Sequence, residues 1–247
     1  MRTLLVIPAR LAATRLPNKP LRLLAGRALI ARVWERVSAM GLGDRCVVAT
    51  DDPLVVAAGE EAGAECVLTS SQCESGTDRV AEVASRGEFR DYELFVNIQG
   101  DEPFIGRASV EGAIALVAGG RFQIGTAAVR AGAEILHNPH IVKVVTADDS
   151  RALYFSRAGI PYPREVAAGP GAVLQHVGVY GYTRAALAKW VALPPHKLEE
   201  MERLEQLRPL AAGMSIGVAV TDDRAAAGID TEEDLAHANE HWMELSA

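Results

Sequence analysis

Three cationic residues follow one another closely near the start of the chain: Arg10, Arg15 and Lys19. They come directly after the apolar run at residues 4–7, which predicts a first buried strand. In open α/β sheets, ligands bind at loops that leave the carboxyl ends of strands. Arginine forks and lysine ammonium groups both suit phosphate oxygens, so the loop predicts a site for a polyanion, most simply a nucleoside triphosphate. The alternative is a basic loop that is only solvated.

Two carboxylates could complete such a site with a metal ion. Asp101 follows the apolar run at residues 94–98, and Gly100 before it lets the backbone turn or approach a ligand closely. Magnesium prefers oxygen ligands and shares them with substrate phosphates, so Asp101 is a candidate ligand; its alternative role is to cap a turn. Asp230, between a predicted strand and a predicted helix, is the candidate second ligand, and its alternative role is helix capping.

Further polar residues lie close together in the sequence and are considered as parts of a binding site. The segment 75–79 opens a predicted helix, whose free amide groups could bind an anion or a base edge. His176 and Tyr180 are separated by an even number of residues in a predicted strand, so we expect them on the same face of the sheet, as the wall of a polar pocket. The alternative for the histidine is a structural role. Charges at residues 199–208 are so dense that most of them must be solvated.

Several common phosphate-binding and catalytic patterns are absent from the sequence. Neither the glycine spacing of a P-loop nor a Gly-x-Gly-x-x-Gly fingerprint follows the first strand, so phosphate binding has to rest on side-chain cations. The serines lack the context of a nucleophile elbow, and no Cys-x-x-Cys spacing occurs. Hydrolysis by a serine or a zinc mechanism is therefore disfavoured.

The composition indicates an ordinary soluble globular protein. The chain has 247 residues, of which 49% are hydrophobic and 23% charged, enough for one sizeable core. Its net charge of −7 argues against a nucleic-acid-binding surface over the whole molecule. Three scattered cysteines, with no signal peptide and no apolar run of membrane length, predict a cytoplasmic protein with reduced thiols and no membrane insertion.

Apolar runs of strand length alternate with helix-length stretches through the first half of the chain. This alternation predicts an α/β fold with a mostly parallel, Rossmann-like nucleotide-binding sheet and helices on both faces. In the last third we expect a helix at residues 198–212, a strand at 216–220 and a final helix after Asp230, with Thr231 as its cap. The expected elements of the first half are strands at residues 4–7, 46–49, 66–68 and 94–98 and helices at 29–40, 53–63 and 77–85.

The middle of the chain lacks this alternation of strands and helices. After a strand at 124–129, β-type runs follow without intervening helices, joined by a segment rich in proline and glycine. We expect residues 131–185 to form an antiparallel β excursion, a sub-domain on a nucleotide-binding core of residues 1–130 and 186–247 within a single domain. A second copy of the chain would cover its apolar faces most simply, so the excursion predicts a dimer flap. The runs lie at residues 141–146, 152–155 and 175–182.

Eight blocks of sequence stand out along the chain, of which the first is IPARLAATRLPNKPL at residues 7–21. The further blocks are VATD (48–51), SGTDR (75–79), VNIQGDEP (96–103), ALYFSR (152–157), HVGVYGY (176–182), LEQLR (204–208) and IDTEEDL (229–235). Taken together, these blocks resemble the sugar-acid cytidylyltransferases, and most closely those that activate 3-deoxy-manno-octulosonate (Kdo). Asn18 departs from the glycine more common in the family, but asparagine tolerates left-handed backbone, so we expect the loop geometry to be retained.

The resemblance implies a reaction of CTP with Kdo that gives CMP-Kdo and pyrophosphate, with Mg²⁺ required, in lipopolysaccharide synthesis by a homodimer. Arg10 and Lys19 would hold the triphosphate with help from Arg15. Asp101 and Asp230 would bind metal, and Arg10, Lys19 and Asp101 would be the catalytic residues. Cytosine and ribose would be bordered by Pro8, Ala9, Ser75, Gly76, Thr77, Asp78 and Arg79. The Kdo site would be lined by Gln99, Arg157, His176, Tyr180, Glu205 and Gln206.

The implied chemistry is an in-line attack of the C2 hydroxyl of Kdo on the α-phosphorus of CTP, with pyrophosphate leaving. Positioning and charge neutralisation dominate such transfers, and a metal-activated hydroxyl needs no separate general base. Three alternatives stay open. They are a cytidylyltransferase for another acidic sugar such as sialic acid or an amino-Kdo, a non-catalytic nucleotide-binding regulator, and a metal-dependent glycosyltransferase.

Overall fold

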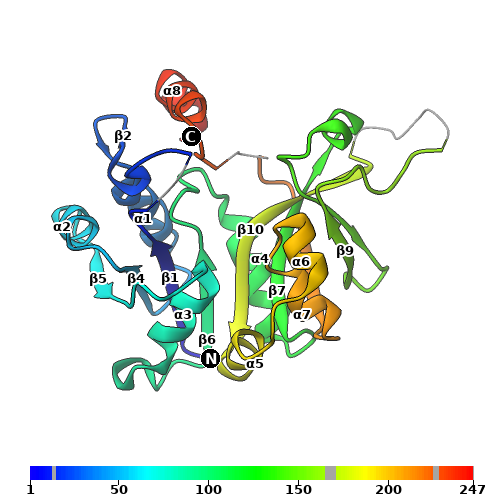
Figure 1. The fold of residues 1–247 in the computed structure, drawn as a ribbon, viewed down its shortest axis with the longest axis horizontal. Coiled ribbons are helices and arrows are strands. Elements are labelled where there is room, and N and C mark those ends of the chain that lie inside the picture. The colour runs from blue at the N-terminus through cyan, green and yellow to red at the C-terminus, as the bar shows by residue number, and fades with distance from the viewer. Residues whose placement is uncertain (13–14, 165–170, 225–227, 247) are drawn as a thin grey trace. The chain divides into compact units, whose positions relative to one another are not determined.

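The computed structural model describes residues 1–12, 15–164, 171–224 and 228–246. The chain divides into two compact units, one made of residues 1–105 and 226–247 and the other of residues 106–225. Figure 1 shows it coloured from blue at the N-terminus to red at the C-terminus. The first unit therefore combines the two ends of the chain, whereas the second is continuous.

The first unit is built on a parallel sheet in the order β6-β1-β4-β5. All residues of β1 and β6 are buried, as their largely apolar sequences require. Ala9 in β1 lies opposite Thr50 in β4, so these two strands end at the same edge of the sheet. The four predicted strands of the first half are confirmed as β1 (Thr3–Ala9), β4 (Arg45–Thr50), β5 (Glu65–Leu68) and β6 (Leu94–Ile98).

Helices cover both faces of this sheet. Helix α1 (Leu29–Met40) joins β1 to β4 and α2 (Pro53–Glu61) joins β4 to β5, whereas α3 (Gly76–Ser85) leads back from β5 to β6. Since crossovers between parallel strands are right-handed, this reversal of direction places α3 on the opposite face from α1 and α2. The predicted helices at residues 29–40, 53–63 and 77–85 are confirmed, with α2 ending at Glu61.

Several short elements and two C-terminal helices complete the first unit. Asn18, just before the first of them, has a φ of 55°, so it adopts the left-handed backbone that we expected an asparagine to tolerate there. Thr231 caps α8 as predicted, because its side chain accepts a hydrogen bond from the amide of Asp234 at 3.1 Å. These elements are η1 (Lys19–Leu21), β2 (Leu23–Leu24), β3 (Arg27–Ala28), η2 (Gly87–Phe89), α8 (Glu232–Glu240) and α9 (Trp242–Leu245).

The second unit contains a mixed sheet. Strand β7 (Ile124–Ala131) pairs in parallel with β11 (Ile216–Thr221) on one side and antiparallel with β10 (Val173–Thr183) on the other. The antiparallel pairing continues from β10 to β8 (Lys143–Thr146) and from β8 to β9 (Ala152–Ser156). The predicted antiparallel excursion is thus confirmed as β8, β9 and β10, and the α/β class with a mostly parallel sheet is confirmed with it.

Two of the helices in this unit were not predicted, and one predicted helix is divided. Helix α4 (Arg107–Ala118) packs against β7, β10 and β11, and α5 (Arg184–Val191) follows β10. The prediction of a single helix at residues 198–212 is wrong: α6 (Lys197–Glu202) ends just before Arg203, and α7 (Leu207–Ala211) is a separate short helix. Arg203 has a φ of 53°, and this left-handed residue turns the chain out of α6. A 3₁₀ turn, η3 (Ala133–His137), follows β7.

The division into units differs from the predicted one. The sequence suggested boundaries at residues 130/131 and 185/186, whereas the second unit runs from residue 106 to residue 225. The second unit is larger than the predicted excursion because of its strand pairing. Strand β10 of the excursion pairs with β7, and β7 pairs with β11, so these strands lie side by side. Residues 165–170 of the predicted excursion lie outside the described residues. Across the described ranges, no helix combines the length and the apolar character needed to cross a membrane.

Helix α4 approaches its sheet closely at a pair of facing glycines, and this contact can be tested. Gly125 in β7 pairs with Gly181 in β10, and a Cβ atom on Gly125 would lie 2.1 Å from the carbonyl oxygen of Ala113 in α4. We expect Gly125→Ala to push the helix away and to destabilise the protein by about 1–3 kcal/mol or more. Urea unfolding followed by circular dichroism measures the change.

The matched control is Gly87→Ala, because a Cβ atom on Gly87 meets nothing within 4 Å. We expect its urea midpoint to stay close to that of the parent protein. Equal midpoints for the two variants would contradict the close packing of α4 on β7.

Candidate active site

The carboxyl edge of the parallel sheet brings the first loop close to the end of β6. A Cβ atom on Gly100 would lie only 2.8 Å from the carbonyl oxygen of Pro8, so a residue with a side chain there would force the two segments apart. Glycine at this position lets the chain after β6 run directly against the end of β1. The next residue, Asp101, is therefore held beside the loop that carries the cations.

One ammonium group connects the two predicted metal-binding carboxylates. Nζ of Lys19 donates to Oδ2 of Asp101 and, at 2.9 Å, to Oδ1 of Asp230. Arg15 adds an ion pair at 2.9 Å to the other oxygen of Asp230, although both of these side chains are well exposed. Burial alone would lower the pKa of Lys19, but the two carboxylates outweigh it and the pKa is raised. Burial would raise the pKa of Asp230, and the ion pairs with Lys19 and Arg15 lower it instead.

The backbone fixes these carboxylates as well. The amide of Ile229 donates to the carbonyl of Asp101 at 2.9 Å, which ties the two acidic segments together. Asp234 accepts from the amide of Asp230 at 3.0 Å and from that of Thr231 at 2.8 Å. Since Thr231 and Asp234 make the capping box of α8, the side chain of Asp230 is not the helix cap and remains available to Lys19.

This pair of carboxylates fits a magnesium ion that shares its ligands with a substrate. Magnesium keeps several waters and takes one or two carboxylates together with substrate phosphates, and Asp101 and Asp230 already converge on one cation. Nowhere in the part of the chain that the structure describes do three or more His, Cys, Asp or Glu residues form a metal-binding group. Burial, with Asp101 and Asp230 nearby, raises the pKa of Glu102 to about 8, which favours the neutral form of this third carboxyl.

The predicted nucleotide residues surround the beginning of α3. A Cβ atom on Gly76 would meet the side chains of Pro8 and Gln99 at 3.3 Å, so these three residues lie together. Arg10 reaches the same segment and donates to the carbonyl of Glu74 at 3.2 Å. Ala9 ends β1 beside Gly100.

Four residues of the 75–79 segment also have structural roles. Ser75 and Asp78 form the capping box of α3, and Thr77 is buried just inside the helix. The guanidinium of Arg79 is buried, donates to Thr69 and lies 3.5 Å from a carboxylate oxygen of Asp51. The helix start is thereby held rigidly, and its role toward cytosine and ribose stays a prediction.

In the second unit, His176 and Tyr180 are brought together as the spacing predicted. Their ring centroids are 5.5 Å apart, although β10 has a bulge between Val177 and Tyr180. Nε2 of His176 lies 2.9 Å from the hydroxyl of Thr126 in β7, and Phe155 packs edge-on against the imidazole at 5.1 Å. Burial lowers the pKa of His176 to about 3, and burial with Tyr182 and Glu205 nearby raises the pKa of Tyr180 well above its usual range.

Glu202 organises the predicted Arg157. One carboxylate oxygen of Glu202 accepts from the hydroxyl of Ser156 at 2.8 Å, and the other accepts from the amide of Arg157 at 2.7 Å. Arg157 Nε donates to the carbonyl of Glu202 at 2.7 Å. Lys143 is fully buried and donates to three carbonyl oxygens, including that of Arg157 at 2.6 Å. Neither Glu202 nor Lys143 was predicted, because the groups that each contacts here are distant along the chain.

Glu205 and Gln206 lie in the turn between α6 and α7, and Gln206 is buried. The two short helices are joined by Glu199 and Arg208, whose guanidinium donates to both carboxylate oxygens at 2.7 and 2.6 Å. Burial would raise the pKa of Glu199, but the hydrogen bonds from Arg208 lower it. This ion pair fixes the turn that carries the two predicted substrate residues.

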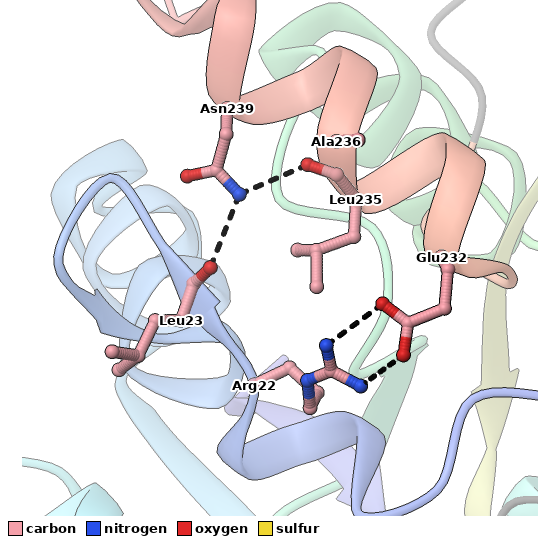
Figure 2. Close-up of a pocket in the computed structure, with 6 residues that line it drawn as sticks. All are labelled: Arg22, Leu23, Glu232, Leu235, Ala236 and Asn239. Atoms are coloured by element: carbon pink, nitrogen blue, oxygen red, sulfur yellow. Dashed lines mark hydrogen bonds and ion pairs between the residues drawn. The ribbon is translucent and has the colours of Figure 1, made fainter.

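A pocket of about 360 Å³ lies next to the segment that carries Asp230 (Figure 2). Arg22 forms a two-point ion pair with Glu232, and Asn239 donates to the carbonyl of Leu23 at 3.2 Å while accepting from the amide of Ala25 at 2.8 Å. These contacts tie α8 to the β2–β3 hairpin and help to place Asp230 beside Lys19. None of the side chains of Arg22, Glu232 and Asn239 was predicted to belong to a site. The pocket is lined by Arg22, Leu23, Glu232, Leu235, Ala236 and Asn239.

A family model described as Cytidylyltransferase matches residues 4–216, which include β1, the cationic loop, Asp101 and the whole of β10. The chain belongs to the cytidylyltransferase family. The recognised resemblance is thereby confirmed, and the glycosyltransferase alternative is wrong.

Individual cytidylyltransferases are similar along the whole chain. A protein of Gemmatimonas aurantiaca named 3-deoxy-manno-octulosonate cytidylyltransferase is 55% identical over 100% of this chain and 96% of its own length. The protein of the same name from Acidobacterium capsulatum is 44% identical over 97% of this chain and 96% of its own. A solved structure of CMP:2-keto-3-deoxy-manno-octonic acid synthetase complexed with CTP has a TM-score of 0.88 at 35% identity, with 99% of both chains covered.

The Glu199–Arg208 pair provides a test of how this cytidylyltransferase holds the α6–α7 turn. Because Glu199→Gln leaves a largely buried guanidinium without its carboxylate, we expect a loss of about 1–3 kcal/mol in unfolding free energy at pH 7. The folded-state pKa of Glu199 is lowered, so its stabilisation is present at neutral pH and is lost as pH falls through that value. Urea unfolding at pH 7 and at about pH 4 measures both effects.

Glu200→Gln is the matched control, since Glu200 is the exposed neighbour in the same helix. It should change stability little at either pH. A Glu199→Gln deficit that stayed constant down to low pH would contradict the ionic origin of the effect.

Proposed function

We propose that the chain transfers a cytidylyl group from CTP to Kdo, giving CMP-Kdo and pyrophosphate. The observation that carries the proposal is the junction of Lys19, Asp101 and Asp230 on a chain that is 55% identical to a named Kdo cytidylyltransferase. Cations for a triphosphate and two carboxylates for a metal are what such a transfer needs at one place. The solved neighbour is described as complexed with CTP, which supports CTP as the nucleotide.

The residues of the first unit would act mainly by positioning and by neutralising charge. Arg10 and Lys19 would bind the triphosphate, with Arg15 assisting, and Pro8, Gly76 and the start of α3 would border the nucleoside. Bound Mg²⁺, held by Asp101 and Asp230, would supply Lewis-acid stabilisation of the phosphates and of the attacking oxygen. With Mg²⁺ on the carboxylates, the ammonium group of Lys19 would be free to pair with phosphate oxygens instead. It would then neutralise negative charge on the leaving pyrophosphate. The C2 hydroxyl of Kdo attacks the α-phosphorus in line with that group.

The polar residues of the second unit would bind the sugar acid. Arg157, organised by Glu202, supplies a cation, and Glu205 and Gln206 are placed by the Glu199–Arg208 pair. His176 and Tyr180 supply neutral hydrogen-bonding groups on one face of β10. Gln99 of the first unit, which was predicted with this set, lies by Gly76 and donates to Asn97 at 3.1 Å.

We further propose that the enzyme is a cytoplasmic homodimer that serves lipopolysaccharide synthesis. Support for a second copy comes from exposed apolar side chains of the second unit, such as Leu153 in β9 and Tyr162 beyond it. Free thiols at Cys46, Cys66 and Cys73 fit a reducing compartment. Sedimentation equilibrium of the purified chain measures the oligomeric state, and a monomer at micromolar concentration would refute the dimer.

The function is tested by pyrophosphate release from CTP with a panel of 2-keto sugar acids. We expect Kdo to be used with the highest kcat/KM. Preference for sialic acid or an amino-Kdo would replace the substrate assignment while keeping the reaction. CTP binding by calorimetry without turnover of any sugar acid would instead support a non-catalytic regulator.

Removal of a single metal-binding carboxylate gives a sharper test. We expect Asp101→Asn to lower kcat by about 100-fold or more at saturating CTP, because one anionic ligand of Mg²⁺ is lost while the fold is retained. The Mg²⁺ concentration needed for half-maximal rate should rise. Steady-state kinetics over a Mg²⁺ titration, with melting temperature as the folding check, provides the measurement.

Asp91→Asn serves as the control, because Asp91 is exposed and forms a long, exposed ion pair with the neighbouring Arg90 at 3.7 Å. Its kinetics should match those of the parent enzyme. Full activity of Asp101→Asn at low Mg²⁺ would remove Asp101 from the metal site.

A further inference from the structure

The hydroxyl of Thr126 lies at the meeting point of three polar groups of β10. Thr126 is fully buried in β7, and the bulge in β10 brings two carbonyl oxygens toward it. Its Oγ1 lies 2.7 Å from the carbonyl oxygen of Val179 and 3.4 Å from that of Val177. On another side, the same oxygen lies 2.9 Å from Nε2 of His176.

The number of available protons determines which group donates in each hydrogen bond of Thr126. A threonine hydroxyl has one proton to donate, and a carbonyl oxygen can only accept. The 2.7 Å contact with Val179 needs that proton, because two oxygens at this distance without one would repel. The hydroxyl is therefore the acceptor toward His176, and Nε2 of the imidazole must carry a proton. In a neutral ring, Nδ1 is then the acceptor.

The surroundings keep the ring neutral. The imidazole packs against the rings of Phe155 and Tyr180 at 5.1 and 5.5 Å, and burial lowers its pKa to about 3. Tyr180, whose pKa is raised well above its usual range by burial, is uncharged as well. At neutral pH the ring therefore has one fixed donor, used by Thr126, and one fixed acceptor.

We propose that Thr126 is a positioning residue that locks His176 in the tautomer protonated on Nε2, so that Nδ1 accepts a hydrogen bond from a hydroxyl group of the sugar acid. The inference rests on the proposed function, in which His176 lines the sugar site. A ring nitrogen that only accepts cannot bind a carboxylate, which also only accepts, so recognition of the carboxylate falls to a cation. His176 accordingly distinguishes sugar acids by the presence and position of a hydroxyl.

The tautomer is measured directly by long-range ¹H–¹⁵N NMR of the full-length protein labelled on histidine. The chain has six histidines, and the signals of His176 are identified by their loss in His176→Gln. At pH 7 we expect a protonated-type shift for Nε2 and an unprotonated-type shift for Nδ1. Protonation on Nδ1, or on both nitrogens, in the parent protein would overturn the proposal.

Two variants of Thr126 separate the hydroxyl from the shape of the side chain. Thr126→Ser keeps the hydroxyl, so it should retain the tautomer and the parent KM for the sugar acid. Thr126→Val keeps the shape but leaves a proton on Nε2 without an acceptor, so the tautomer protonated on Nδ1 should predominate. The KM for the sugar acid should then rise about tenfold, because only the minor tautomer can accept from the hydroxyl, while the KM for CTP should stay unchanged. An unchanged tautomer in Thr126→Val would show that the hydroxyl does not fix it.

The outcomes distinguish this inference from the proposed function. Absence of turnover with any sugar acid would remove the substrate role, while the NMR of the parent protein would still report the tautomer. A locked tautomer with an unaltered KM in Thr126→Val would instead refute the recognition of a hydroxyl through Nδ1.

Discussion

The organisation of the first unit depends on one ammonium group that two carboxylates share. Lys19, Asp101 and Asp230 come from the beginning, the middle and the end of the chain, and their ion pairs join three segments that the parallel sheet alone would leave as separate loops. Burying the lysine is unfavourable by itself, and the two carboxylates compensate for it. The nearby backbone supports this arrangement. Asn18 turns the loop with its left-handed conformation, and Gly100 permits the close approach of its segment to Pro8. The amide of Ile229 donates a hydrogen bond to the carbonyl of Asp101.

Much of this unit could be predicted because its signals are local. The strand at residues 94–98 follows from an uninterrupted apolar run, and a carboxylate directly after it must lie at the carboxyl edge of a parallel sheet. The cations after β1 lie at the same edge for the same reason. Thr231 and Asp234 are three residues apart and form the capping box that this spacing favours, which leaves the side chain of Asp230 for Lys19. The identity of the nucleotide and of the sugar came from the family resemblance, not from these patterns.

The features that the sequence did not reveal depend on partners that are distant along the chain. Nothing near Glu202 indicates that it accepts from Ser156 and Arg157, and nothing near Thr126 indicates a contact with His176. The break after α6 is similar: residues 198–212 have a helical composition, but Arg203 adopts a left-handed conformation where Glu199 and Arg208 draw two short helices together. The extent of the second unit escaped prediction because sequence pattern alone does not specify that β10 pairs with β7 and β7 with β11.

The candidate functional residues of the two units differ in their charge state. In the first unit the groups remain charged, since the ion pairs raise the pKa of Lys19 and lower that of Asp230, and this suits phosphates and a divalent cation. In the second unit, burial favours the neutral forms of both His176 and Tyr180. A sugar acid has one carboxylate and several hydroxyls, so a single cation with several directional neutral groups matches it better than a cluster of charges would. A charged imidazole could pair with any anion, including a phosphate, whereas a neutral acceptor of fixed tautomer admits only a donor at the right place. Under the proposed assignment of His176 to the sugar site, its neutrality would therefore be a source of selectivity for the sugar.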